Sequence, residues 1–119
     1  MSTFSKVIEV GTGRYTVIHS DAALAEFNKE RMDSGLEVGL AALDTWRNVI
    51  ILPERRHANP VSEDYIRECM VHELGHAMFR NYGVNIEETQ IEEDVCLMLE
   101  HALIPLLRHN PALVKWLCE

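Results

Sequence analysis

The amino-acid sequence predicts an α+β domain in which three main helices pack on a small antiparallel sheet. Two pairs of short β-branched or apolar runs lie in the first 52 residues, and a turn signal joins each pair. Longer segments with apolar residues at helical spacing follow them. The chain has 119 residues, the length of one domain, and contains no internal repeat or long linker. We therefore expect residues 1–119 to form a single domain.

The first half of the chain is expected to form the sheet and one helix. Gly11 and Gly13 supply the positive φ that a tight turn between the first two strands needs. Ser20 or Asp21 can cap the helix that follows. Residues 49–52, Val-Ile-Ile-Leu, predict the most buried strand. The expected elements are strands over 4–10 and 14–19, a helix over 22–32, and strands over 37–43 and 48–52.

The second half is expected to be helical. Pro60 and Ser62 suit the first turn and the cap of a helix that ends near Gly83. Apolar residues recur at helical spacing through the next segment, in which Pro105 is expected to introduce a kink. The Asn-Pro pair at 110–111 separates a last short amphipathic segment. The expected elements are a helix within 59–83, a helix over 87–108 and a last turn or two over 112–118.

Composition and charge favour a cytoplasmic protein that binds neither nucleic acid nor membranes. The formal net charge is −8, whereas phosphate binding requires a basic face, and no basic cluster is evident. No apolar run approaches the roughly 20 residues of a membrane-spanning helix, and the first residues do not resemble a signal peptide. The 3 cysteines are widely spaced and odd in number, which indicates a reducing compartment rather than a disulfide framework.

The strongest chemical signal is His-Glu-Leu-Gly-His at residues 72–76. His72 and His76 are four residues apart, so on a helix they project from one face and can bind the same zinc ion. Glu73 lies close enough to act on a water at the metal. The simplest alternative is a helix with two incidental histidines. The partial burial expected for this helix favours a metal, because half-buried imidazoles need partners.

A catalytic zinc needs a third protein ligand, and we expect it on the next helix. Glu92 is three residues before Val95 and four before Cys96, so it lies within the apolar stripe, where a carboxylate needs a cation. Glu93 is rotated by about 100° and is the alternative. Cys69 shares the helix face of the histidines and could instead ligate zinc, although a buried core thiol is the simpler reading.

The motif at 72–76 resembles the active-site helix of the gluzincin metallopeptidases. The later segment is similar to the glutamate helix of ImmA/IrrE-like proteins, in which an apolar pair and a proline-containing end follow the ligand glutamate. The resemblance covers about residues 60–111 and extends to small phage and prophage HExxH proteins. The matching residues are Glu92, the Met-Leu pair at 98–99 and Leu-Ile-Pro at 103–105.

This resemblance implies a minimal zincin, or minigluzincin-like, domain with a defined set of site residues. Carried over, His72, His76 and Glu92 would hold Zn²⁺, and Glu73 would be the catalytic base. The chain departs from the family at residues 95–96, Val-Cys, where the family prefers Ala followed by Asn or Asp. A polar group behind the metal ligands is therefore replaced by a thiol.

The expected function is zinc-dependent hydrolysis of peptide bonds in a protein or peptide substrate. Glu73 would take a proton from water and deliver it to the leaving nitrogen. The resemblance also implies that an extended substrate would pair with residues 49–52 as an edge strand. The alternative is a zinc-containing but catalytically silent binding or inhibitor protein that acts through protein contacts. Glu73 favours the enzyme, because a purely structural zinc site has no use for this residue.

Overall fold

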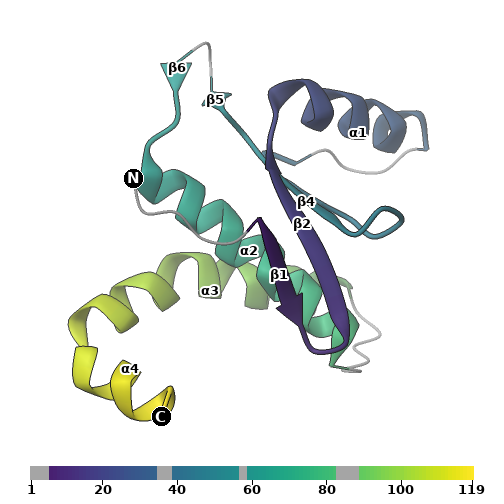
Figure 1. The fold of residues 1–119 in the computed structure, drawn as a ribbon. Helices are drawn as coiled ribbons and strands as arrows, with labels where there is room; N and C mark the ends of the chain where they lie inside the picture. The colour runs from purple at the N-terminus through teal and green to yellow at the C-terminus, as the bar shows by residue number, and fades with distance from the viewer. Residues whose placement is uncertain (1–5, 35–38, 57–58, 83–88) are drawn as a thin grey trace.

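The computed structural model describes residues 6–34, 39–56, 59–82 and 89–119. Over these residues it confirms an α+β fold, in which four helices accompany a small four-stranded sheet (Figure 1). A two-stranded hairpin, β5 and β6, precedes the second helix. The strands are β1 (Val7–Val10), β2 (Gly13–His19), β3 (Ala42–Asp44), β4 (Val49–Leu52), β5 (Arg55–Arg56) and β6 (Asn59–Pro60). The helices are α1 (Asp21–Asp33), α2 (Glu63–Asn81), α3 (Thr89–His109) and α4 (Pro111–Leu117).

The four-stranded sheet is mixed, so the expectation of an antiparallel sheet is wrong. Its order is β1-β2-β4-β3, and both expected hairpins form antiparallel pairs. Between the hairpins, however, β2 and β4 run parallel, with Thr16 opposite Val49 and His19 opposite Leu52. Local turn signals specify each hairpin, but they carry no information on how the chain returns through α1 to place one hairpin beside the other.

Strand β4 lies inside the sheet, which overturns its expected role as an edge strand for substrate. Its two neighbours are β2 and β3, so its backbone groups are already paired on both sides. Ile50 and Leu52 pack with residues of α2, while Ile51 packs with residues of α1. The continuous apolar run is therefore explained by an interior strand that helices cover on both faces (Figure 1).

Helix α2 has well-defined ends. The Ser62 hydroxyl accepts a hydrogen bond from the Tyr65 backbone N–H at 3.1 Å, which makes Ser62 the N-cap as expected. Pro60 belongs to β6 instead of the first helical turn. The helix ends at Asn81, and the expected stop at Gly83 lies outside the described residues.

Helix α3 runs antiparallel to α2. Gly75 of α2 lies against Cys96 of α3, and Asp64 near the start of α2 pairs with Arg108 near the end of α3 at 2.9 Å. Pro105 lies inside α3, as expected. None of the helices in the described segments combines the length and the apolar character that a membrane crossing requires. The antiparallel pairing brings the acidic start of α3 beside the histidines of α2.

Candidate metal centre

Helix α2 places His72 and His76 side by side. The two ring centroids are 5.0 Å apart, and the rings are inclined by 64°. Their side chains are 15% and 21% exposed, so each ring is largely covered but one side stays accessible. The spacing of four residues thus produces the pair of imidazoles that the sequence predicts.

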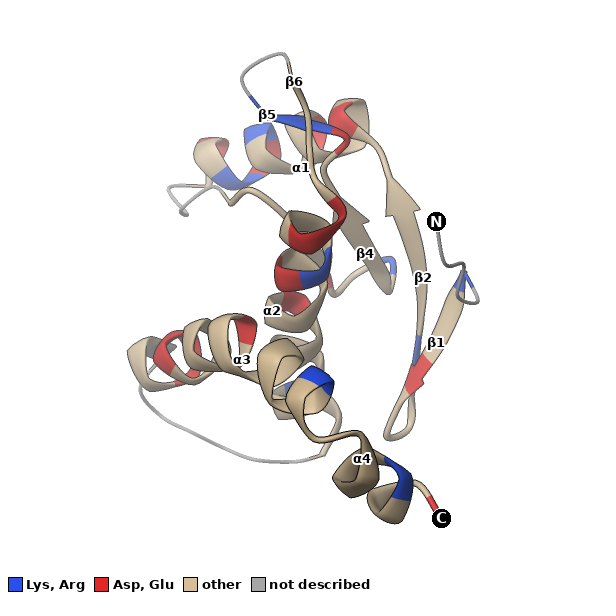
Figure 2. Ribbon diagram, turned by 90° about the vertical axis from the view of Figure 1, so that its left-hand side faces the viewer, with Lys and Arg blue, Asp and Glu red and all other residues tan. Residues whose placement is uncertain are grey.

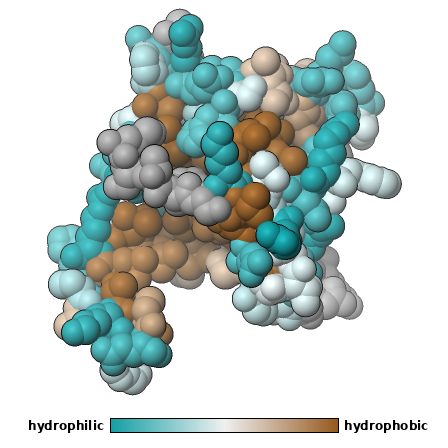
Figure 3. All heavy atoms as spheres, viewed as in Figure 1, coloured by the Kyte–Doolittle hydropathy of each residue, from teal (hydrophilic) through white to brown (hydrophobic). Residues whose placement is uncertain are grey.

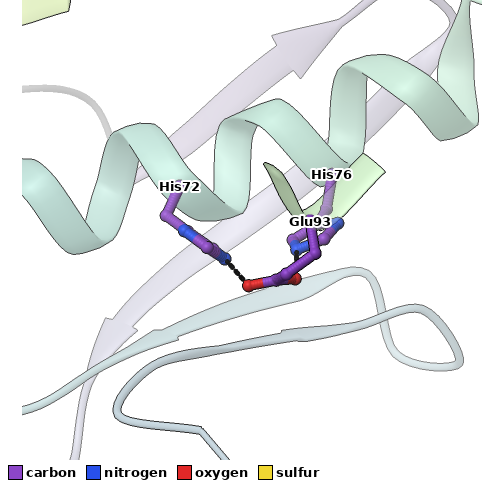
Figure 4. A group of neighbouring side chains, drawn as sticks. All are labelled: His72, His76 and Glu93. Carbon is purple, nitrogen blue, oxygen red and sulfur yellow. Dashed lines mark ion pairs between the residues drawn. The ribbon is translucent and has the colours of Figure 1, made fainter. Parts of the chain in front are cut away.

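Glu93 of α3 faces both rings with its carboxylate. One oxygen, Oε1, lies 2.9 Å from Nε2 of His72, and the other, Oε2, lies 3.0 Å from Nε2 of His76. Figure 4 shows the two rings projecting from α2 toward this carboxylate. The three residues form a group whose possible metal-ligating atoms all lie within 4.8 Å of one another. Two imidazole nitrogens and a carboxylate oxygen therefore converge on one point.

The other nitrogen of each ring also meets a carboxylate. Nδ1 of His72 lies 2.7 Å from Oε1 of Glu100, and Nδ1 of His76 lies 2.7 Å from Oε2 of Glu92. A carboxylate can only accept here, so each Nδ1–H donates to it. This hydrogen bond orients the ring and leaves Nε2 as the nitrogen that can bind a metal.

The site carries an excess of negative charge. Four carboxylates adjoin the two imidazoles, so with all four ionised a net charge of about −2 remains even when both rings are protonated. Imidazoles that bind a metal through Nε2 are neutral, so a divalent cation held there would offset two of the four carboxylate charges. The four carboxylates belong to Glu73, Glu92, Glu93 and Glu100.

The structure separates the two candidates for the third ligand. The sequence predicts Glu92 in this role, with Glu93 as the alternative. Among the described residues, the group that can hold a metal with His72 and His76 includes Glu93, whereas Glu92 lies behind His76. The apolar stripe marks the residues that fill the contact between α2 and α3, such as Cys96. Glu93 lies at the border of that contact, where its carboxylate reaches the Nε2 atoms of both rings.

Glu100 is a site residue that the sequence analysis missed. It lies seven residues after Glu93, about two helical turns along the same side of α3. This spacing is the signal that could have found it. The second oxygen of Glu100 approaches Nε2 of His101 at 3.5 Å, and the His101 side chain is largely exposed.

Glu73 is buried beside the histidines, with a residual exposure of 7%. Burial raises the pKa of its carboxyl to about 7, against the opposing effect of His72 and with a contribution from the negative charge of Glu93. A carboxyl with this pKa exchanges protons readily at neutral pH. Its burial and pKa match the role of proton acceptor and donor that the motif predicts.

The two buried thiols stay outside this arrangement. Burial raises the pKa of Cys69 to about 11 and that of Cys96 to about 12, so both are protonated at neutral pH. In the described part of the chain, neither belongs to a group that could hold a metal. Cys69 instead packs in the core with Ile50 and Ala77, in agreement with its reading as a core thiol.

No protein-family model, curated protein or solved structure matches this chain.

Proposed function

We propose that this protein is a zinc-dependent peptidase whose metal is held by His72, His76 and Glu93. The observation that carries the proposal is that both Nε2 atoms face the Glu93 carboxylate while both Nδ1 atoms are held by other carboxylates. Two imidazoles and one carboxylate form a donor set typical of catalytic zinc, which keeps a further position open. These residues fit the metal, and they fit it better with Glu93 than with Glu92 as the third ligand.

The roles of the protein groups follow from this arrangement. Bound zinc would supply Lewis-acid chemistry, since it polarises a carbonyl group and acidifies water. Glu73 would accept a proton from the water as the water oxygen adds to the peptide carbonyl carbon. It would then pass that proton to the nitrogen as the C–N bond breaks.

Glu92 and Glu100 would act behind the metal ligands. Each accepts a hydrogen bond from one Nδ1–H, so each fixes the ring whose Nε2 would bind zinc. Cys96 stands where the resembled family has a polar residue. Both imidazoles would nevertheless have a hydrogen-bond acceptor, because Glu100 and Glu92 supply it.

Because β4 is an interior strand, an extended substrate would have to pair with a different strand from the one that the sequence predicts. If an extended peptide adds a strand to this sheet, it needs an unpaired edge, and β4 has none. The edge next to β4 is β3, which spans Ala42–Asp44. We propose this edge in place of residues 49–52.

One observation favours a second function, that of a zinc-containing binding or inhibitor protein. Helix α4, all of whose residues are described, contains no buried residue and lies at the end of the molecule away from α1 (Figures 1 and 2). Figure 3 shows hydrophobic atoms gathered on the face beside it. Such a surface can bind a protein partner. The exposed apolar residues of α3 and α4 include Met98, Leu106, Leu113, Trp116 and Leu117.

The Glu73→Gln variant distinguishes these functions. We expect it to keep one zinc per chain, measured by mass spectrometry of metals, and to lose about 10²–10⁴-fold in peptide cleavage because the proton acceptor is gone. Cleavage is measured with casein-type and proteome-wide substrates. A zinc-loaded wild type that cuts no peptide would contradict the peptidase and favour the binding protein.

The state of the cysteines bears on the cellular compartment. All three cysteines lie in described segments and are free, including the exposed Cys118. We infer a reducing, cytoplasmic environment from this unpaired state.

A further inference from the structure

Gly75, within the His-Glu-Leu-Gly-His motif, lies directly against Cys96 of α3. A Cβ atom added at Gly75 would lie 2.7 Å from Sγ of Cys96, which is closer than non-bonded atoms approach. The next nearest atoms of Cys96, Cβ and Cα, would lie at 3.5 and 3.6 Å, in ordinary contact. The Sγ atom of Cys96 thus occupies the space that a Cβ atom at position 75 would need.

The sulfur atom has little freedom to move away. Cys96 is fully buried, and a helical cysteine has few alternative rotamers because one χ1 position clashes with the preceding turn. A side chain at position 75 would therefore push the two helices apart instead of displacing the thiol alone.

The contact lies at the level of the metal centre on both helices. Gly75 is three residues after His72 and one before His76. Cys96 is three residues after Glu93 and four before Glu100, so it lies between the carboxylates along α3. These carboxylates belong to one rigid helix and must move with it.

We propose that Gly75 is a positioning residue, whose lack of a Cβ atom lets α3 pack against α2 at Cys96 and thereby holds the carboxylates of α3 on the two histidines. The inference rests on the proposed metal site. The four histidine–carboxylate distances span 2.7–3.0 Å, so an outward shift of α3 lengthens all of them together. The backbone at Gly75 is that of an ordinary α-helix, so no special backbone conformation calls for glycine here. What the position needs is the absence of a Cβ atom.

The proposal makes a reciprocal prediction for three variants of the full chain, Gly75→Ala, Cys96→Ala and the double variant. Gly75→Ala is expected to weaken Zn²⁺ binding by about 10–100-fold, the loss typical when the groups around metal ligands are disturbed. Cys96→Ala keeps the affinity within about threefold, because neither metal ligand nor carboxylate is changed. In the double variant the two methyl carbons would lie at the 3.5 Å now measured to Cβ of Cys96, so the affinity should return to that of Cys96→Ala.

Two measurements keep positioning separate from stability and from the proposed function. The Zn²⁺ dissociation constant is measured by competition with a coloured chelator, and the ¹⁵N spectra of the His72 and His76 rings are recorded in metal-free protein. Ala77→Val is the matched control, because Ala77 is a fully buried α2 residue that packs in the core cluster with the strands of the sheet. It should lower the melting temperature without changing either readout.

The outcomes are decisive in each direction. Zn²⁺ binding to Gly75→Ala as tight as in wild type, or a double variant as weak as Gly75→Ala, would overturn the proposal. If Gly75→Ala does not fold, the double variant must still fold and bind Zn²⁺ like Cys96→Ala. If wild type binds no Zn²⁺, the metal site fails, and the pair is judged by the ring spectra. Gly75→Ala must then lose the wild-type pattern and the double variant must regain it.

Discussion

Helices α2 and α3 contribute to the same site in different ways. On α2, the site residues are His72, Glu73 and His76, and the helix lies between the sheet and α3. Their relative placement follows from the geometry of one helix. On α3, Glu93 and Glu100 reach the histidines only because α3 docks at one particular rotation and separation. The comparison teaches that half of the centre is encoded by local spacing and half by the contact between two helices.

The largest expected effect is on the free energy of unfolding and concerns β4, the strand on which α2 packs. Ile50 of β4 is fully buried in the core cluster that includes Cys69 and Ala77 of α2. Ile50→Ala should lower the free energy of unfolding by about 2–5 kcal/mol, because it removes packed methyl groups and leaves a cavity. Denaturant titration of the full chain measures this loss.

Trp116→Ala on α4 is the matched control for that prediction. Its side chain is 69% exposed, so we expect a change within about 0.5 kcal/mol. A loss at Trp116 as large as the loss at Ile50 would show that α4 is part of the stable core, and the comparison between a packed and an exposed region would fail.

The next effect concerns the carboxylates that α3 places behind the rings. Glu92→Gln and Glu100→Gln should each weaken Zn²⁺ binding by about 10–100-fold, or about 1.4–2.7 kcal/mol, because an amide orients an imidazole less strongly than a carboxylate. Isothermal titration with Zn²⁺ measures the affinity. Asp94→Asn is the control, because it removes an acid from the same helix. Asp94 is exposed and accepts a hydrogen bond from Gln90, so its replacement should leave the Zn²⁺ affinity unchanged. An equal loss in Asp94→Asn would point to net charge instead of ring orientation.

The smallest effect concerns Asp44, which with Glu73 is one of the two buried carboxylates in the described segments. Burial alone would raise the pKa of Asp44, but hydrogen bonds from the Arg47 side chain and from the backbone N–H groups of Arg47 and Trp46 outweigh it and lower the pKa. Asp44 thus stabilises the fold above its unfolded-state pKa of about 4, and this stabilisation is lost as the pH falls through the lower folded-state value.

Wild type should therefore exceed Asp44→Asn in unfolding free energy by about 1 kcal/mol at pH 7. The difference should shrink below about pH 4. Urea titrations at several pH values measure it. A difference that stays constant into acid would mean that charge on Asp44 plays no part.

The sequence predicts the elements of this fold better than their arrangement. Ser62 identifies the start of α2, and both hairpins follow from their turns. The parallel pairing of β2 with β4 could not be predicted, because it depends on the path through α1 and not on any local pattern.

The site divides in the same way. The spacing of His72 and His76 is enough to place their rings together. Glu92 and Glu93 are adjacent, and a rotation of about 100° on α3 decides which of them faces both Nε2 atoms. The apolar stripe indicates Glu92, whose carboxylate meets Nδ1 of His76, whereas the carboxylate that faces both Nε2 atoms belongs to Glu93, beside the packed surface. Buried Cys96 marks that surface, and Glu93 lies at its border.

The zinc content of Glu93→Gln and Glu92→Gln, purified in parallel and dialysed against buffer with a weak chelator, tests the central claim most directly. The account predicts that Glu93→Gln retains almost no zinc, because a ligand is lost, while Glu92→Gln retains a substantial fraction, because only the orientation of His76 is weakened. The reverse result, with zinc lost from Glu92→Gln and kept by Glu93→Gln, would contradict it.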